Sequence, residues 1–119
     1  MSTQRAVRIY IAGPYSNGDT TDNVLTAIEA GTRCLDAGLA PFVPHLNHFW
    51  HAVLPRGNEE WMRLDFEWLG ACDVLLRLPG ESPGAEREVA LANKLGLPVY
   101  YDIDFMLEEL GHAYVEVQA

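Results

Sequence analysis

The hydrophobic positions of the chain alternate between short continuous runs and stretches of helical spacing. Apolar or β-branched runs predict strands at residues 7–12, 40–44, 73–78, 97–101 and 114–117. Between them, apolar residues at helical spacing predict helices at about residues 24–37, 58–71, 85–95 and 103–110. Strands that alternate with helices are typical of a parallel sheet that is covered by helices on both faces.

Turn-forming residues separate these elements. Gly38 and Gly96 follow two of the predicted helices where a left-handed residue commonly ends a helix, and residues 20–23 offer N-caps for the first one. Residues 45–57, H-L-N-H-F-W-H-A-V-L-P-R-G, show no clear period, and we interpret them as a long loop or lid with a short helix. We therefore expect an α/β fold, a flavodoxin-like or Rossmann-like three-layer sandwich. Its parallel sheet has five strands in the order 2-1-3-4-5, within a single domain over residues 1–119.

Composition narrows the classes of partner. The formal net charge of −9 argues against a surface for nucleic-acid polymers, which needs clustered Lys and Arg, but it is compatible with a small anionic ligand held by backbone N–H groups. Cys34 and Cys72 are far apart and form no CxxC motif, which favours two buried thiols of a cytosolic protein. No apolar run has the length of a signal core or a membrane span, so we expect a cytoplasmic protein without membrane contact.

Residues 78–92, L-P-G-E-S-P-G-A-E-R-E-V-A-L-A, contain the first candidate for chemistry. They read as a strand end, a loop and a helix start, which is where open α/β sheets bind their ligands. Glu88 falls on the apolar stripe of this helix with Ala85 and Ala92, whereas Glu86 belongs to the solvated face. Glu88 either lies at the margin of the stripe as a structural residue or faces inward. An uncompensated inward carboxylate costs on the order of several kcal/mol and therefore usually has a function.

Asp65 is the second carboxylate on an apolar helix face. The predicted buried face of its helix consists of Trp61, Leu64, Trp68, Leu69 and Cys72. Asp65 lies one turn from Trp61 and from Leu69, so it either bonds a neighbouring loop or faces the same site as Glu88. A carboxylate pair is what glycosyl cleavage uses. Tyr10 in the first strand is either a plain core residue or orients one of these carboxylates, because a buried hydroxyl needs a partner.

The loop after the first strand is a candidate wall of the binding site. Gly13, Pro14, Tyr15 and Ser16 could offer backbone N–H groups and hydroxyls to a ligand. The loop has neither the P-loop pattern nor G-x-G-x-x-G, so ATP and dinucleotide chemistry have no support, and we expect no cofactor.

Three histidines follow the second strand. His45, His48 and His51 are spaced three residues apart, which on a helix would line one face. They allow three interpretations: simple packing, a lid or base-stacking role together with Phe49 and Trp50, and a metal-dependent enzyme. No H-E-x-x-H pattern accompanies them, so we favour packing over a lid, and a lid over metal. His45 directly follows a strand and is the best placed to meet a ligand.

Several short motifs together resemble one known superfamily. They are I-Y-I-A-G-P-Y-S from residue 9, D-F-E-W-L-x-x-C-D-V from residue 65, S-P-G-A-x-x-E-x-A-x-A from residue 82, and G-x-P-V from residue 96. In this order and spacing they resemble the nucleoside 2-deoxyribosyltransferase-like superfamily over residues 9 to about 101. Within it, the chain is most similar to the nucleoside 5′-monophosphate N-glycosidases and their uncharacterised bacterial and phage relatives.

The resemblance implies a flavodoxin-like fold and cleavage of an N-glycosidic bond. In the matching positions, Glu88 would attack or stabilise the anomeric carbon, Asp65 would assist the leaving base, and Tyr10 would orient Glu88. The matching loop, Ser82-Pro83-Gly84, would lie near the ligand at a helix N-terminus.

The resemblance also implies a homodimer or larger oligomer in which neighbouring chains complete the site. Two positions depart from the pattern: Ala90 replaces a glycine, and the first loop carries Asp19 without the basic residue of many phosphate-preferring relatives. The substrate would be a nucleoside or nucleotide, and the bond would be broken by hydrolysis or by transfer to another base. The alternative is a module of the same fold that binds nucleotides without catalysis.

Overall fold

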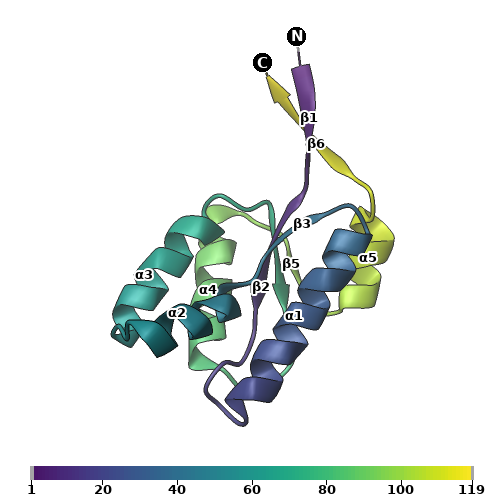
Figure 1. Cartoon of the computed structure of the whole chain (residues 1–119). Helices are drawn as coiled ribbons and strands as arrows, with labels where there is room; N and C mark the ends of the chain where they lie inside the picture. Colours follow the sequence, from purple (N-terminus) through teal and green to yellow (C-terminus); the bar gives the residue numbers. More distant parts are fainter. Residues whose placement is uncertain (1, 119) are drawn as a thin grey trace.

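A four-stranded parallel sheet forms the centre of the protein in the computed structural model, which describes residues 2–118 (Figure 1). Its strands, in the order β3-β2-β4-β5, are β3 (Ala40–Phe42), β2 (Arg8–Ala12), β4 (Val74–Arg77) and β5 (Val99–Tyr100). All three pairings are parallel, and Tyr10 lies opposite both Phe42 and Leu75. The parallel pairing needs crossover connections, which the helices between the strands supply.

Five helices lie along the sheet. They are α1 (Thr20–Asp36), α2 (Asn47–Val53), α3 (Asn58–Leu69), α4 (Pro83–Leu95) and α5 (Ile103–Leu110), and a 3₁₀ turn η1 (Pro44–Leu46) precedes α2. In Figure 1, α1 and α5 cover one face of the sheet, while α3 and α4 cover the other with α2 beside them. The segment that we interpreted as a long loop with a short helix is thus largely helical. None of the helices in residues 2–118 is long and apolar enough to span a membrane.

The alternation of side chains along the two central strands divides the core into two layers. Ile9 and Ile11 of β2 pack under α1 and α5, while Tyr10 and Ala12 point to the side of α3 and α4. Strand β4 alternates in the same way, so Leu75 joins the layer of Tyr10. This register puts Tyr10 on the face of the sheet that α4 covers.

The prediction of a fifth parallel strand is wrong. Its residues form β6 (Tyr114–Gln118), which pairs antiparallel with an unpredicted strand, β1 (Ser2–Ala6). Figure 1 shows this two-stranded ribbon projecting from the sheet and carrying both chain ends. After α5 the chain turns through His112, which has a left-handed backbone, and so leaves the sheet. The strand β5 contributes only two residues and remains an edge.

Helix boundaries follow local capping chemistry. The N-cap of α1 is Asp19, whose carboxylate accepts from the backbone N–H of Asp22, and not one of residues 20–23 as predicted. Ser82 caps α4 in the same way through Ala85, and Pro83 occupies the first position of this helix. Gly96 ends α4 in the left-handed conformation that the sequence predicts. Because Asp19 is an N-cap, it is part of the scaffold of the first loop.

Candidate functional site

A cavity of about 530 Å³ opens where the central strands end. The segments that follow β2, β3 and β4 contribute to its wall, together with α3 and α4. The carboxyl ends of parallel strands are the usual place for a ligand in an open α/β sheet. The predicted site residues that line the cavity are Gly13, Tyr15, Ser16, His45, Asp65, Ser82, Pro83, Gly84 and Glu88.

Glu88 is a buried carboxyl group in the cavity wall, with only 6% of its surface exposed. It comes from the second turn of α4, and its Oε2 accepts a hydrogen bond from the hydroxyl of Tyr10. Burial, with a contribution from the charge of Asp65, raises the pKa of Glu88 to about 8, although the bond from Tyr10 opposes this shift. Burial also raises the pKa of Tyr10, so its hydroxyl keeps its proton and acts as the donor.

Asp65 faces the same cavity from α3. It is 8% exposed, and its Oδ1 accepts from the side-chain amide of Asn47 at 3.2 Å. Burial raises the pKa of Asp65 to about 7, against the opposing effect of the Asn47 bond. The buried face of α3 consists of Met62, Asp65 and Leu69, whereas Trp68, which we expected on that face, is half exposed and stacks on Phe42.

His45 forms hydrogen bonds with the backbone of the loop after β2. The imidazole is 5% exposed, and its Nε2 lies 3.2 Å from the carbonyl oxygen of Gly13 and 3.0 Å from that of Pro14. Because both neighbours are acceptors, Nε2 carries the proton, and burial lowers the pKa of the ring so that it stays neutral. Pro14 does not line the cavity, and within residues 2–118 the Nδ1 atom of His45 has no hydrogen-bond partner.

The other two histidines have protein partners. The Nδ1 atom of His48 lies 2.7 Å from the hydroxyl of Tyr15, and that of His51 accepts from the indole N–H of Trp61 at 2.9 Å. Over the described chain, residues 2–118, no group of three His, Cys, Asp or Glu side chains is arranged to hold a metal ion. His48 and His51 thus shape the cavity wall through contacts with aromatic residues.

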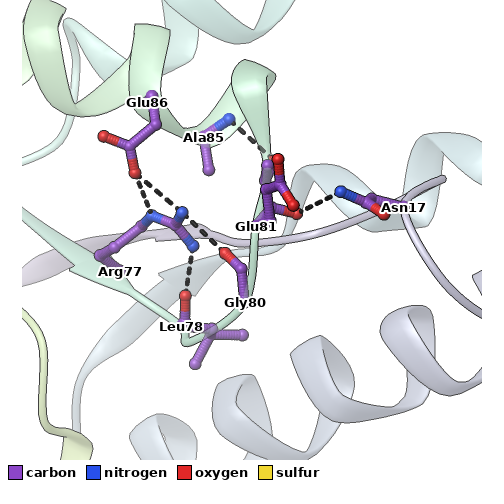
Figure 2. A network of polar contacts seen from close by, with 8 residues as sticks. Asn17, Arg77, Leu78, Gly80, Glu81, Ala85 and Glu86 are labelled. Carbon is purple, nitrogen blue, oxygen red and sulfur yellow. Dashed lines mark hydrogen bonds and ion pairs between the residues drawn. The ribbon is translucent and has the colours of Figure 1, made fainter.

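The end of the loop between β4 and α4 and the first turn of α4 contribute Ser82, Pro83 and Gly84 to the cavity wall. Figure 2 shows the polar contacts of this loop. The Oγ atom of Ser82 accepts from the backbone N–H of Ala85 at 3.0 Å, and the carbonyl of Ser82 accepts from Glu86 N. The side-chain amide of Asn17 donates to the carbonyl oxygen of Glu81 at 3.0 Å, which joins this loop to the loop after β2.

Sequence reasoning missed part of the wall. The missed side chains with polar or aromatic groups are Asn17, Asn47, Arg56, Asn58 and Trp61, whereas His48 and His51, which we considered for packing or a lid, also line the cavity. Asn47 and Arg56 come from residues 45–57, where the sequence has no clear period, and Asn58 and Trp61 come from the first turns of α3. Asn17 and Asn47 carry a usable signal, because each lies shortly after a strand end, as His45 does.

The two carboxyl groups can act as an acid and base pair or as a nucleophile with an acid. Both have a pKa near neutrality, so each can change its proton content at physiological pH. The hydroxyl of Tyr10 donates to Glu88 and so fixes the orientation of its carboxyl group, although Tyr10 itself does not line the cavity. The site thus brings two carboxyl groups that can exchange protons to one cavity.

Comparisons with known proteins agree with the architecture. Residues 7–102 match the family described as a domain of unknown function (DUF7768). The structure is similar to a 2-deoxyribosyltransferase of Bacillus psychrosaccharolyticus, with 25% identity and a TM-score of 0.57, over 90% of this chain and 84% of that one. It also shares its fold with a 2-deoxyribosyltransferase from Leishmania mexicana, with 20% identity and a TM-score of 0.59, over 78% of this chain and 61% of that one. No curated protein gives a significant sequence match.

Proposed function

The chain belongs to the DUF7768 family, and we propose that it cleaves the N-glycosidic bond of a nucleoside or nucleoside 5′-monophosphate. The observation that carries this proposal is the buried carboxyl pair, Glu88 and Asp65, in one cavity with a tyrosine hydroxyl on Glu88. Similarity to 2-deoxyribosyltransferases supports glycosyl chemistry as the class of reaction.

Glu88 is the nucleophile in this proposal. Its ionised carboxylate attacks the anomeric carbon, the bond from that carbon to the base nitrogen breaks, and a glycosyl-enzyme ester forms. Asp65 in its protonated form assists the departing base, and Tyr10 holds the Glu88 carboxylate in line with the anomeric carbon. Water or a second base then attacks the ester, which gives the free sugar or a new nucleoside and restores Glu88.

An aromatic side chain in the cavity wall is consistent with binding of a planar base. Trp61 lines the cavity, and its indole is fixed by the hydrogen bond to His51. The start of α4, with Ser82 and Gly84 in the wall, supports binding of polar groups of the sugar or of a 5′-phosphate, because helix N-termini favour anions. We include assembly into a homo-oligomer and a cytoplasmic location in the proposal.

Base release tests the proposal. Ribo- and deoxynucleosides and their 5′-monophosphates are incubated with the protein, and free base is measured by chromatography. Glu88→Ala should abolish release, whereas Glu29→Ala, an exposed glutamate on α1, should leave it intact. Unchanged release by Glu88→Ala would rule out the mechanism.

A second incubation separates hydrolysis from transfer. Adenine is added together with thymidine, and formation of deoxyadenosine identifies a transferase, while free deoxyribose identifies a hydrolase. Saturable calorimetric binding of a nucleotide without any product after long incubation would instead support the non-catalytic binding module.

A further inference from the structure

Arg77 is a buried charge directly behind the site. It is the last residue of β4, on the same side of the strand as Leu75, and its side chain is 8% exposed. Figure 2 shows its guanidinium at the centre of a set of acceptors. One Nη donates to the carbonyl of Leu78, and the other donates to that of Gly80 at 2.9 Å. The guanidinium also donates to Oε1 of Glu86 at 2.9 and 3.3 Å.

These bonds join three consecutive pieces of the chain. Leu78 belongs to the strand end, Gly80 to the loop, and Glu86 to the first turn of α4. Arg77 itself does not line the cavity, whereas Ser82, Gly84 and Ala85 do. The planar guanidinium of Arg77, with its several N–H donors, therefore holds the backbone that leads into this part of the cavity wall.

The same loop is in tight contact with the other wall. Gly80 has a backbone φ of +116°, and a Cβ atom there would lie 2.7 Å from Cγ of Pro14. A Cβ atom at Gly13 would lie 2.9 Å from Cβ of Leu78. The bond from Asn17 to the carbonyl of Glu81 adds a polar contact, so the loop after β2 and the loop after β4 are packed directly against each other.

We propose that Arg77 and Glu86 are positioning residues that hold residues 78–82 and the first turn of α4, and thereby place Ser82 and Glu88 against the substrate. The sequence pattern assigned Glu86 to the solvated face, and its side chain is indeed 67% exposed, yet it anchors a buried guanidinium. The charge of Arg77 also lowers the pKa of Glu88, in opposition to burial. The kinetic part of this inference rests on the proposed function, and the structural part does not.

Hydrogen exchange tests the structural part. In Arg77→Lys, which keeps the charge but loses the planar set of donors, the hydrogen-bonded amides of Leu78, Ala85 and Glu86 should exchange about tenfold faster or more. Each hydrogen bond of a charged group contributes a factor of about ten to a hundred. Glu86→Ala should do the same to a smaller extent. The matched control is Glu59→Ala, since Glu59 is an exposed glutamate paired with Arg87, next to Glu86 on α4. Exchange in both variants at the control rate would overturn the proposal.

Steady-state kinetics test the functional part. With the nucleoside or monophosphate that gives base release, Arg77→Lys and Glu86→Ala should raise KM or lower kcat at least fivefold. In Arg77→Lys, the limb of the pH–rate profile that reports ionisation of Glu88 should stay near its wild-type position. Arg77→Met should in addition move that limb to higher pH. Glu86→Ala leaves Arg77 its two carbonyl acceptors, Leu78 and Gly80, so it is the milder variant and serves if the Arg77 variants do not fold.

Two results remain distinguishable. If the wild type releases no base, the proposed function fails, and loop exchange alone decides whether Arg77 and Glu86 hold the wall. If base is released but both variants match Glu59→Ala in KM, kcat and exchange, the positioning role is wrong and the proposed function stands.

Discussion

Replacing Glu88 with glutamine should stabilise the fold at alkaline pH. The carboxyl group has a pKa of about 8 in the folded protein and a usual value of 4.5, so folding is opposed wherever the group must ionise. Below about pH 4.5 the carboxyl group is protonated in both states and imposes no ionisation penalty on folding. The free energy of unfolding falls as pH rises from there towards 8, because the folded state keeps a proton that the unfolded state has already released. Glutamine keeps the shape, has no charge and can still accept a bond from Tyr10.

The magnitude follows from the two pKa values. A difference of about 3.5 units at 1.36 kcal/mol per unit gives an upper value of about 5 kcal/mol for the penalty at pH 9. Part of it arises from the charge of Asp65, which shares the cavity, and part of it is recovered by relaxation and water entry. We therefore expect Glu88→Gln to raise the free energy of unfolding at pH 9 by about 2–4 kcal/mol.

Urea unfolding at pH 5, 7 and 9 measures this effect. The gain should grow with pH, whereas Glu29→Gln, the same substitution at an exposed position of α1, should follow the wild type. The reasoning is refuted if Glu88→Gln is no more stable than the wild type at pH 9, or if its gain is independent of pH.

Three further substitutions test separate contacts. Tyr10→Phe should lower kcat about 10- to 100-fold in the base-release assay, because it removes one hydrogen bond to a charged group; full activity would contradict the orienting role. Asp65→Asn should move the Glu88 limb of the rate profile to lower pH, since the charge of Asp65 raises the pKa of Glu88; a limb that moves upward would contradict the coupling. Gly80→Ala should cost about 1–3 kcal/mol of unfolding free energy, because its φ is +116° and its Cβ would meet Pro14. The control for this change is Gly70→Ala, where φ is −62° and the nearest atom is 3.5 Å away, and equal effects of the two would refute it.

The elements with a strong hydrophobic period could be predicted from the sequence. The helix at residues 103–110 has the predicted bounds, and the ends of α4 and of the two central strands differ from prediction by at most two residues. Glu88 and Asp65 were found by the same signal, since each interrupts an apolar helix face. Their burial is confirmed, while their catalytic roles stay predictions.

The errors arise where long-range pairing overrides local pattern. Residues 2–6 are mostly polar and carry no strand signal, yet they form β1 because β6 supplies the backbone partners. The same pairing takes residues 114–118 away from the parallel sheet. Arg77 could not be assigned either, because only the folded loop brings the carbonyls of Leu78 and Gly80 to its guanidinium.

The buried carboxyl pair favours catalysis over passive binding. Two such groups oppose folding at neutral pH, since burial is the largest cause of the raised pKa of both. The amide of Asn47 on Asp65, and the hydroxyl of Tyr10 and the charge of Arg77 near Glu88, compensate only in part. A module that only binds nucleotides would gain stability from asparagine and glutamine at these positions without losing hydrogen-bonding capacity. Positive charge that develops on the sugar during glycosyl cleavage would attract Glu88 in its ionised form, and that interaction is strongest in the transition state. The proposed glycosyl cleavage would therefore give the buried carboxyl pair a role that passive binding does not.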